Sequence, residues 1–151
     1  MVGLYEYFAA PDDTAAAAAV RCDAASLGLP SIGLVIGIDP ALQMARLESL
    51  LRGIENGLVI GEPRWCVPVT SLKRGRGPWI VTITDGLCES LAAADDTALA
   101  QTVWLWARTQ PLSVTELARR ENALADFLSD FADLAREARA SDRHLYCWMS
   151  L

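Results

Sequence analysis

The segment from Ser113 to Ala140 reads SVTELARRENALADFLSDFADLAREARA and is the clearest long element of the chain. Apolar residues return along it at the 3.6-residue spacing of an α-helix, which gives the helix one continuous apolar face. We therefore predict one long amphipathic helix that packs against the rest of the fold through this face. The apolar positions are Val114, Leu117, Leu124, Phe127, Leu128, Phe131, Leu134 and Ala138.

The same segment carries a row of carboxylates, Asp126, Asp130, Asp133 and Glu137, at steps of four, three and four residues. Residues at these spacings are neighbours on a helix, and we call these four residues the acidic stripe. Like charges at this spacing destabilise an isolated helix by roughly 0.2–0.5 kcal/mol per pair. The stripe is therefore either a solvated face or a docking surface for a basic partner.

Shorter elements precede and follow this helix. The clearest helix start is Asp39-Pro40, an N-cap followed by proline, and Gly53 supplies the stop. Two runs flank a linker that holds Lys73, Arg74 and Arg76, which predicts a hairpin with a basic tip. Paired strands mixed with blocks of helices favour an α+β fold with a small mixed or antiparallel sheet. The predicted strands are 2–8, 31–38, 65–70, 79–84 and 145–151, and the predicted helices are 15–20, 40–53, 85–93 and 97–108.

Length and composition predict one α+β domain, 1–151. The chain has 151 residues, of which 52% are hydrophobic, enough to close one core. Its net charge of −6 and pI near 4.7 argue against nucleic acid and anionic membranes as partners. No apolar stretch approaches the roughly 20 residues that span a bilayer, and no signal peptide is recognisable. We therefore predict a cytoplasmic protein with four reduced cysteines.

Motifs for metal or nucleotide binding do not occur in the sequence. There is one histidine, His144, and neither zinc-site spacings nor glycine-rich nucleotide motifs are present. We expect no metal and no cofactor. Cys147 follows His144 by three residues, and on a strand these two side chains point to opposite faces, which argues against a catalytic thiolate–imidazolium pair.

Aromatic residues form pairs on the first and last predicted strands. Tyr5 and Tyr7 share one face of the first strand, and Tyr146 and Trp148 share one face of the last. If these two strands are neighbours, the four rings could stand on one side of the sheet. They would then either fill a core or form the walls of a ligand pocket. Polar groups for such a pocket would come from Asp39, Glu62 or Asp85.

Several short motifs together resemble the YfbM-like family of uncharacterised bacterial proteins and small alanine-rich actinobacterial proteins. They are GLYEYF at 3–8, LESLLRG at 47–53, GEP at 61–63, LADFLSDFADLAREA at 124–138 and LYCWMS at 145–150. The resemblance implies a single-domain α+β fold and supplies no established reaction. The family's Trp and His before Leu-Leu-x-Gly are Met44 and Glu48 here, so no shared polar site is carried over.

These observations leave three functional hypotheses. The first is an acidic protein-binding module, of which one version is an immunity-type protein that neutralises a basic partner through the acidic stripe. The second is a small cofactor-free enzyme or ligand-binding protein that uses the aromatic pocket. The third is a homodimer formed through apolar surface near Trp104 and Trp106.

Overall fold

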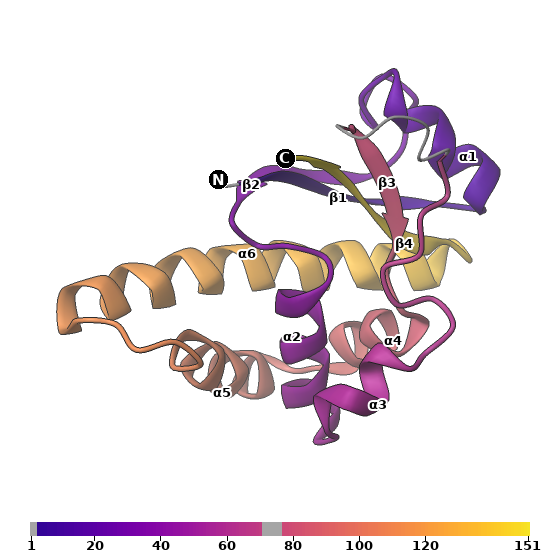
Figure 1. Cartoon of the computed structure of the whole chain (residues 1–151). Helices are drawn as coiled ribbons and strands as arrows, with labels where there is room; N and C mark the ends of the chain where they lie inside the picture. Colours follow the sequence, from indigo (N-terminus) through magenta and orange to yellow (C-terminus); the bar gives the residue numbers. More distant parts are fainter. Residues whose placement is uncertain (1–2, 71–76) are drawn as a thin grey trace.

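Four strands form one antiparallel sheet in the order β2-β1-β4-β3 (Figure 1). The computed structural model describes residues 3–70 and 77–151, and the fold below refers to these residues. β1 pairs with both β2 and β4, so segments from the two ends of the chain lie side by side at the centre of the sheet. The strands are β1 (Leu4–Ala10), β2 (Ser31–Ile36), β3 (Trp79–Thr82) and β4 (His144–Ser150).

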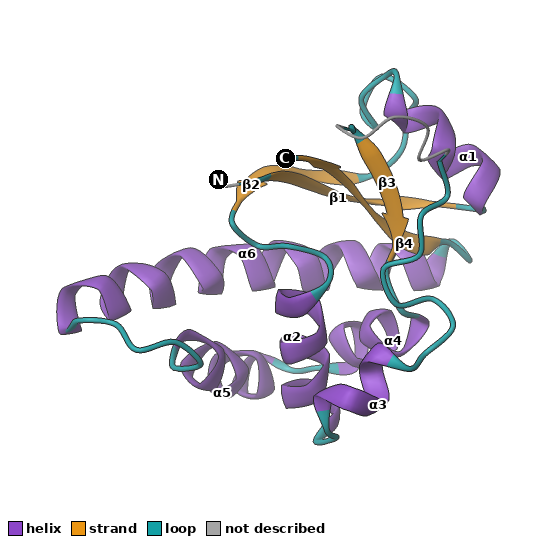
Figure 2. Cartoon of the chain, in the orientation of Figure 1, coloured by secondary structure: helices purple, strands orange, loops and turns teal. Residues whose placement is uncertain are grey.

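The helices add two layers to this sheet. α6 runs across one face of the sheet, and α2, α4 and α5 lie on the far side of α6 (Figure 2). The short α1 and η1 lie by the opposite face of the sheet, near β3. This is the α+β architecture that the sequence predicts. The helices are α1 (Asp13–Ala17), the 3₁₀ helix η1 (Ala18–Val20), α2 (Leu42–Arg52), α3 (Asn56–Ile60), α4 (Asp85–Ala93), α5 (Asp96–Ala107) and α6 (Val114–Ala140).

The long C-terminal helix is confirmed as α6 over 27 uninterrupted residues. It begins with a capping box, in which Ser113 Oγ accepts the Glu116 N–H and the Glu116 carboxylate accepts the Ser113 N–H. Its apolar face is buried from Leu124 onward. The first turns extend past the body of the protein, so Val114, predicted to pack, is 87% exposed.

The main core lies between the inner face of the sheet and α6. The Tyr7 ring packs against Phe127 and Phe131, with centroids 5.5 and 5.0 Å away. Its hydroxyl donates to the Ile38 carbonyl at 2.5 Å, so the buried phenol has a partner. A smaller cluster, which includes Phe8 and Tyr146, fills part of the outer face beneath α1 and η1.

Most predicted elements are present, with differences at their ends. α2 begins two residues later than predicted, and its N-cap residue is Ala41 and not Asp39, although Asp39 accepts the N–H groups of Ala41 and Leu42 at 3.0 and 2.7 Å. The predicted strand at 65–70 is wrong as a regular strand, because residues 65 and 66 form a turn and only Pro68 bridges β3, at Val81. The tip with Lys73, Arg74 and Arg76 lies outside the described residues.

Candidate functional site

The acidic stripe lies on solvent-exposed positions of α6. Asp126, Asp130, Asp133 and Glu137 are all exposed, opposite the face that packs in the core. Within residues 3–70 and 77–151, Asp133 forms an ion pair with Arg136 at 3.0 Å, whereas Asp126, Asp130 and Glu137 form none. Three of the four carboxylates are therefore without an ion-pair partner among the described residues.

Part of the stripe lines an open groove of about 660 Å³ between α6 and the start of β2. Asp130, Asp133, Leu134 and Glu137 form the helical wall. The opposite wall consists of residues 25 and 28–32, which lead into β2 and carry no charged side chain. We call this feature the acidic groove. Its one-sided charge attracts cationic groups and repels anionic ones.

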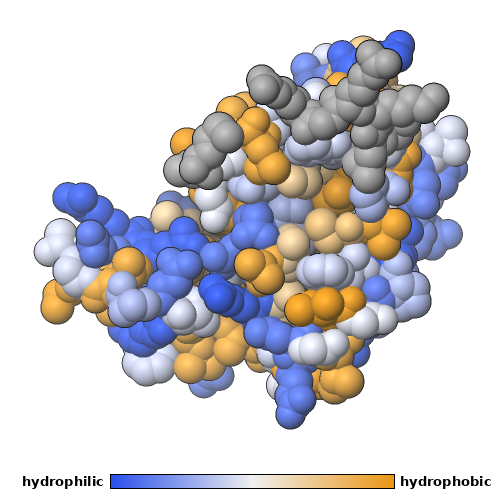
Figure 3. All heavy atoms as spheres, viewed as in Figure 1, coloured by the Kyte–Doolittle hydropathy of each residue, from blue (hydrophilic) through white to orange (hydrophobic). Residues whose placement is uncertain are grey.

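The strand beside the groove, β2, is an edge of the sheet. Leu34 and Ile36 project from it with 61% and 66% of their surfaces exposed. Figure 3 shows apolar residues gathered at the end of the sheet next to the chain termini, whereas hydrophilic and apolar residues are mixed at the end formed by α5 and the first turns of α6. Charge and exposed apolar surface thus meet along β2.

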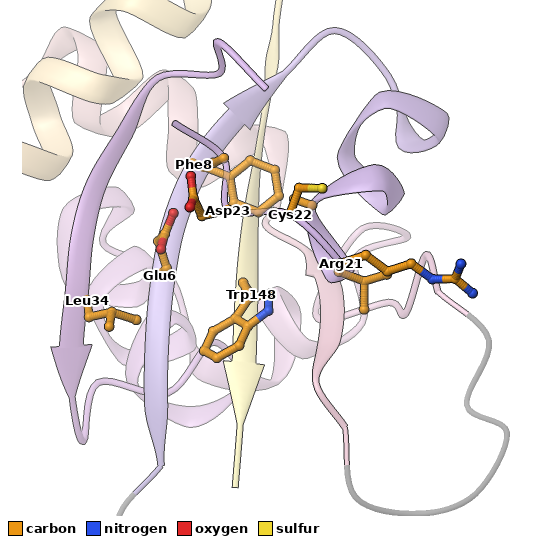
Figure 4. Close-up of a pocket in the computed structure, with 10 residues that line it drawn as sticks. Glu6, Phe8, Arg21, Cys22, Asp23, Leu34 and Trp148 are labelled. Atoms are coloured by element: carbon orange, nitrogen blue, oxygen red, sulfur yellow. The ribbon is translucent and has the colours of Figure 1, made fainter. Parts of the chain in front are cut away.

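A second hollow, of about 290 Å³, lies on the outer face of the sheet. Leu34, Glu6 and Trp148, from three neighbouring strands, surround it, and Cys22 and Asp23 lie above them (Figure 4). The Arg21 guanidinium points away from it. The Glu6 carboxylate accepts the Ser31 hydroxyl at 2.9 Å. We call this hollow the outer-face cavity; it is mostly apolar, with carboxylates at its rim.

The predicted pocket of four aromatic rings is not formed. β1 and β4 do pair, as expected, but Tyr7 lies opposite Cys147 and Phe8 lies opposite Tyr146. Directly opposed residues of an antiparallel pair point to the same face, so Tyr146 and Trp148 share the outer face with Phe8, while Tyr5 and Tyr7 point into the inner core. Of these four rings, only Trp148 lines the outer-face cavity.

The polar groups proposed for that pocket have other partners. Asp39 accepts two backbone N–H groups where α2 begins, and Glu62 forms an ion pair with Arg52. Asp85 lies 2.9 Å from the Nδ1 atom of His144 and 3.6 Å from the Nε atom of Arg64. These contacts tie elements together and leave the three carboxylates dispersed.

Arg64, which the sequence analysis did not identify, lies in the loop after α3 and contacts α1, near the start of the chain, and β4, near its end. Its guanidinium lies 3.3 Å from Asp13 and 5.3 Å from the centre of the Tyr146 ring. The Tyr146 hydroxyl donates to Asp13 at 2.7 Å, and burial together with this carboxylate raises the pKa of Tyr146 to about 12. A neutral phenol held in this way is a structural group and a poor acid at neutral pH.

Burial disfavours the thiolate form of three of the four cysteines. All four cysteines are free, with Cys22 exposed and Cys88 and Cys147 buried. Burial raises the pKa of Cys66 and of Cys88 to about 11, and that of Cys147 well above its usual value. Cys147 lies inside the core, whereas His144 contacts Asp85 at the surface, so the two do not form a catalytic pair.

The described ranges contain no cluster of three or more His, Cys, Asp or Glu side chains that could hold a metal ion. None of the helices in these ranges is both long and apolar enough to cross a membrane. The two tryptophans considered for a dimer differ in exposure. Trp106 is buried and its indole N–H donates to the Gln43 side-chain oxygen at 3.0 Å, whereas Trp104 is exposed and its ring lies beneath the Arg108 guanidinium. Trp104 thus contributes exposed apolar surface and Trp106 does not, and the homodimer stays a prediction.

Comparisons with protein-family models, with curated proteins and with solved structures found no match, so the resemblance to YfbM-like proteins stays a prediction and the function has to be inferred from the geometry described above.

Proposed function

We propose that this protein is a protein-binding module that docks a basic partner in its acidic groove. One observation carries the proposal: Asp126, Asp130 and Glu137 stand exposed and unpaired among the described residues, two of them on the wall of the groove. Like charges at these spacings oppose helix formation, so folding alone gives no reason for the stripe. A cationic partner would relieve this repulsion.

An immunity-type role fits this chemistry. A protein with net charge −6 attracts a basic protein over long range, which raises the association rate and orients the encounter. If the partner is a basic enzyme with an anionic substrate, the bound acidic protein would block the surface to which that substrate binds. The four free thiols support a reducing compartment, and we propose the bacterial cytoplasm as the site of action.

The test compares two variants of equal net charge. One replaces Asp126, Asp130 and Asp133 by Asn, and the control replaces three exposed carboxylates elsewhere, Glu55→Gln, Asp96→Asn and Asp142→Asn. The probe is a short oligolysine peptide, titrated calorimetrically at low and at physiological ionic strength.

The stripe variant should bind the peptide about tenfold more weakly than wild type, because each lost contact removes about 0.5 kcal/mol, and its salt dependence should be shallower. The control variant should stay close to wild type. Equal weakening by both variants would show that net charge alone acts and would refute the groove. Both variants should retain the native circular dichroism spectrum, since none of the replaced side chains is buried.

The outer-face cavity supports a second candidate, binding of a small amine with an apolar body. Trp148 and Phe8 offer apolar walls, and Glu6 offers a carboxylate beside them. Phenethylamine is a suitable probe, with the change in tryptophan fluorescence as the signal. Saturable binding that Trp148→Phe silences and Glu6→Gln weakens would support this candidate; a signal unchanged in both variants would eliminate it.

A further inference from the structure

The outer side of β2 is an unpaired sheet edge. β1 occupies its inner side, and no other strand of the described ranges pairs with it. Gly37 donates its N–H to the Gly3 carbonyl, at the end of the β1–β2 ladder. Successive residues of an antiparallel strand direct their N–H and C=O groups to alternate sides, so Val35 faces β1, while Leu34 and Ile36 direct theirs toward the open edge.

This edge has few of the features that usually protect sheet edges. Soluble proteins place charged residues, proline or bulges on exposed edge strands to prevent pairing with other chains. β2 reads SIGLVI, with no charge and no proline. A β-bulge near its start displaces only the first residues, which leaves Leu34, Val35 and Ile36 in regular register with β1.

We propose that the basic partner binds by adding an extended segment to β2 as a fifth, antiparallel strand. This inference rests on the proposed function and specifies how the partner is held. The backbone of the partner's added strand would form hydrogen bonds with the free N–H and C=O groups of Leu34 and Ile36. Antiparallel addition continues the pattern of the whole sheet.

Alternation along the added strand defines the chemistry of the partner. Side chains on one face stand beside Leu34 and Ile36, which favours apolar residues there. Side chains on the other face stand on the side of α6, where Asp130, Asp133 and Glu137 line the acidic groove, which favours lysine or arginine. The segment recognised is therefore one in which basic and apolar residues alternate.

A second copy of this chain fits the edge poorly. A two-fold axis at β2 would place α6 on the same side of both sheets and bring the two acidic grooves next to each other. The carboxylates of both copies would then oppose one another, and each copy carries a net charge of −6. Charge complementarity selects a basic segment.

The test uses end-capped peptides of alternating lysine and valine, titrated into the whole protein and followed by amide NMR signals and calorimetry. Two peptides carry N-methyl groups, one on the valine nitrogens and one on the lysine nitrogens. In antiparallel addition, residues opposite Leu34 and Ile36 share their outer face and turn their N–H groups to β2, so these are the valines. N-methylation of valine should weaken binding by more than about tenfold, whereas N-methylation of lysine should leave it within about twofold.

Hydrogen exchange of the Leu34 and Ile36 amides should slow when the unmethylated peptide binds. Equal affinity for all three peptides, with the stripe variant still binding more weakly, would overturn strand addition and leave the basic-partner function standing. Sensitivity to valine methylation with no loss in the stripe variant would overturn the basic partner. Absence of any stripe-dependent binding would overturn the proposed function and with it this inference.

Discussion

Glu48 is buried, with 1% of its surface exposed, where α2 meets the start of α4. It accepts the Thr84 hydroxyl at 2.6 Å and an Arg52 N–H at 2.9 Å. Thr84 also caps α4 by accepting the Leu87 N–H, so this carboxylate links two helices through one hydroxyl. Burial outweighs these hydrogen bonds and raises the pKa of Glu48 above its ordinary value of 4.5.

This shift predicts a pH-dependent contribution to stability. Because the pKa of Glu48 is higher in the folded state, the contribution is fully present below about pH 4.5 and is lost as the pH rises through the folded-state pKa. The free energy of unfolding of the wild type should therefore fall, relative to that of Glu48→Gln, as the pH rises above about 4.5. Urea unfolding across this range measures the difference, with exposed Glu55→Gln as the control. A rise with pH in the free energy of unfolding of the wild type, relative to that of Glu48→Gln, would contradict the raised pKa.

The cysteines give a second prediction at the level of single residues. Cys22 is exposed, whereas burial raises the pKa values of Cys66, Cys88 and Cys147. A thiol reagent at neutral pH should therefore label one cysteine rapidly in the native protein, and Cys22→Ser should abolish that fast phase. In denaturant all four should react. Fewer than four reactive thiols after unfolding would mean that disulfides had formed.

Unpaired thiols could be predicted from the sequence because the four cysteines are widely spaced along the chain. The contact of Glu48 with Thr84 could not be predicted. The two residues lie 36 positions apart, and they meet only because α2 and α4 pack together. A carboxylate inside a helical pattern gives no local sign that the helix will turn it inward.

Among the elements, α6 was the easiest to predict, because its apolar spacing persists over many turns. Strand contacts were harder. The pairing of β1 with β4 was anticipated, but periodicity within each strand does not say which residues lie opposite one another. The register sets Phe8 against Tyr146, and this alone separates the four rings that, from the sequence, could have stood on one side of the sheet.

The buried part of α6 and its exposed first turn should differ sharply in how much stability is lost when a side chain is replaced by alanine. Phe131 has no exposed surface and packs on Tyr7 and Phe127, so Phe131→Ala should lower the free energy of unfolding by about 3–5 kcal/mol. Val114 on the same helix is 87% exposed, and Val114→Ala should change it by less than about 0.5 kcal/mol. Chemical denaturation of both variants measures this. Comparable losses would mean that the first turns of α6 pack against something in solution.

For the whole molecule, the acidic composition indicated a class of partner but gave no location for it. The stripe was visible in the sequence, and its exposure follows from the apolar face opposite it. The acidic groove depends on the segment 25–32, which lies about a hundred residues from the stripe in the chain. The open edge of β2 depends on the strand order, which sequence patterns do not supply. The surface proposed here therefore arises only when the chain is folded.

Net charge and the open edge of β2 together predict how the protein behaves in solution. At neutral pH, mutual repulsion at a net charge of −6 should keep molecules apart despite the unprotected edge, so sedimentation velocity should give a monomer of 16.3 kDa. Close to the isoelectric point of about 4.7 this repulsion disappears, and the apolar edge strand should drive association. Ile36→Lys places a charge on that edge and should suppress association, whereas Val114→Lys adds the same charge on the remote end of α6 and should not. A dimer at neutral pH would show that repulsion between acidic surfaces does not protect β2. Equal association of the two variants near the isoelectric point would show that association does not proceed through β2.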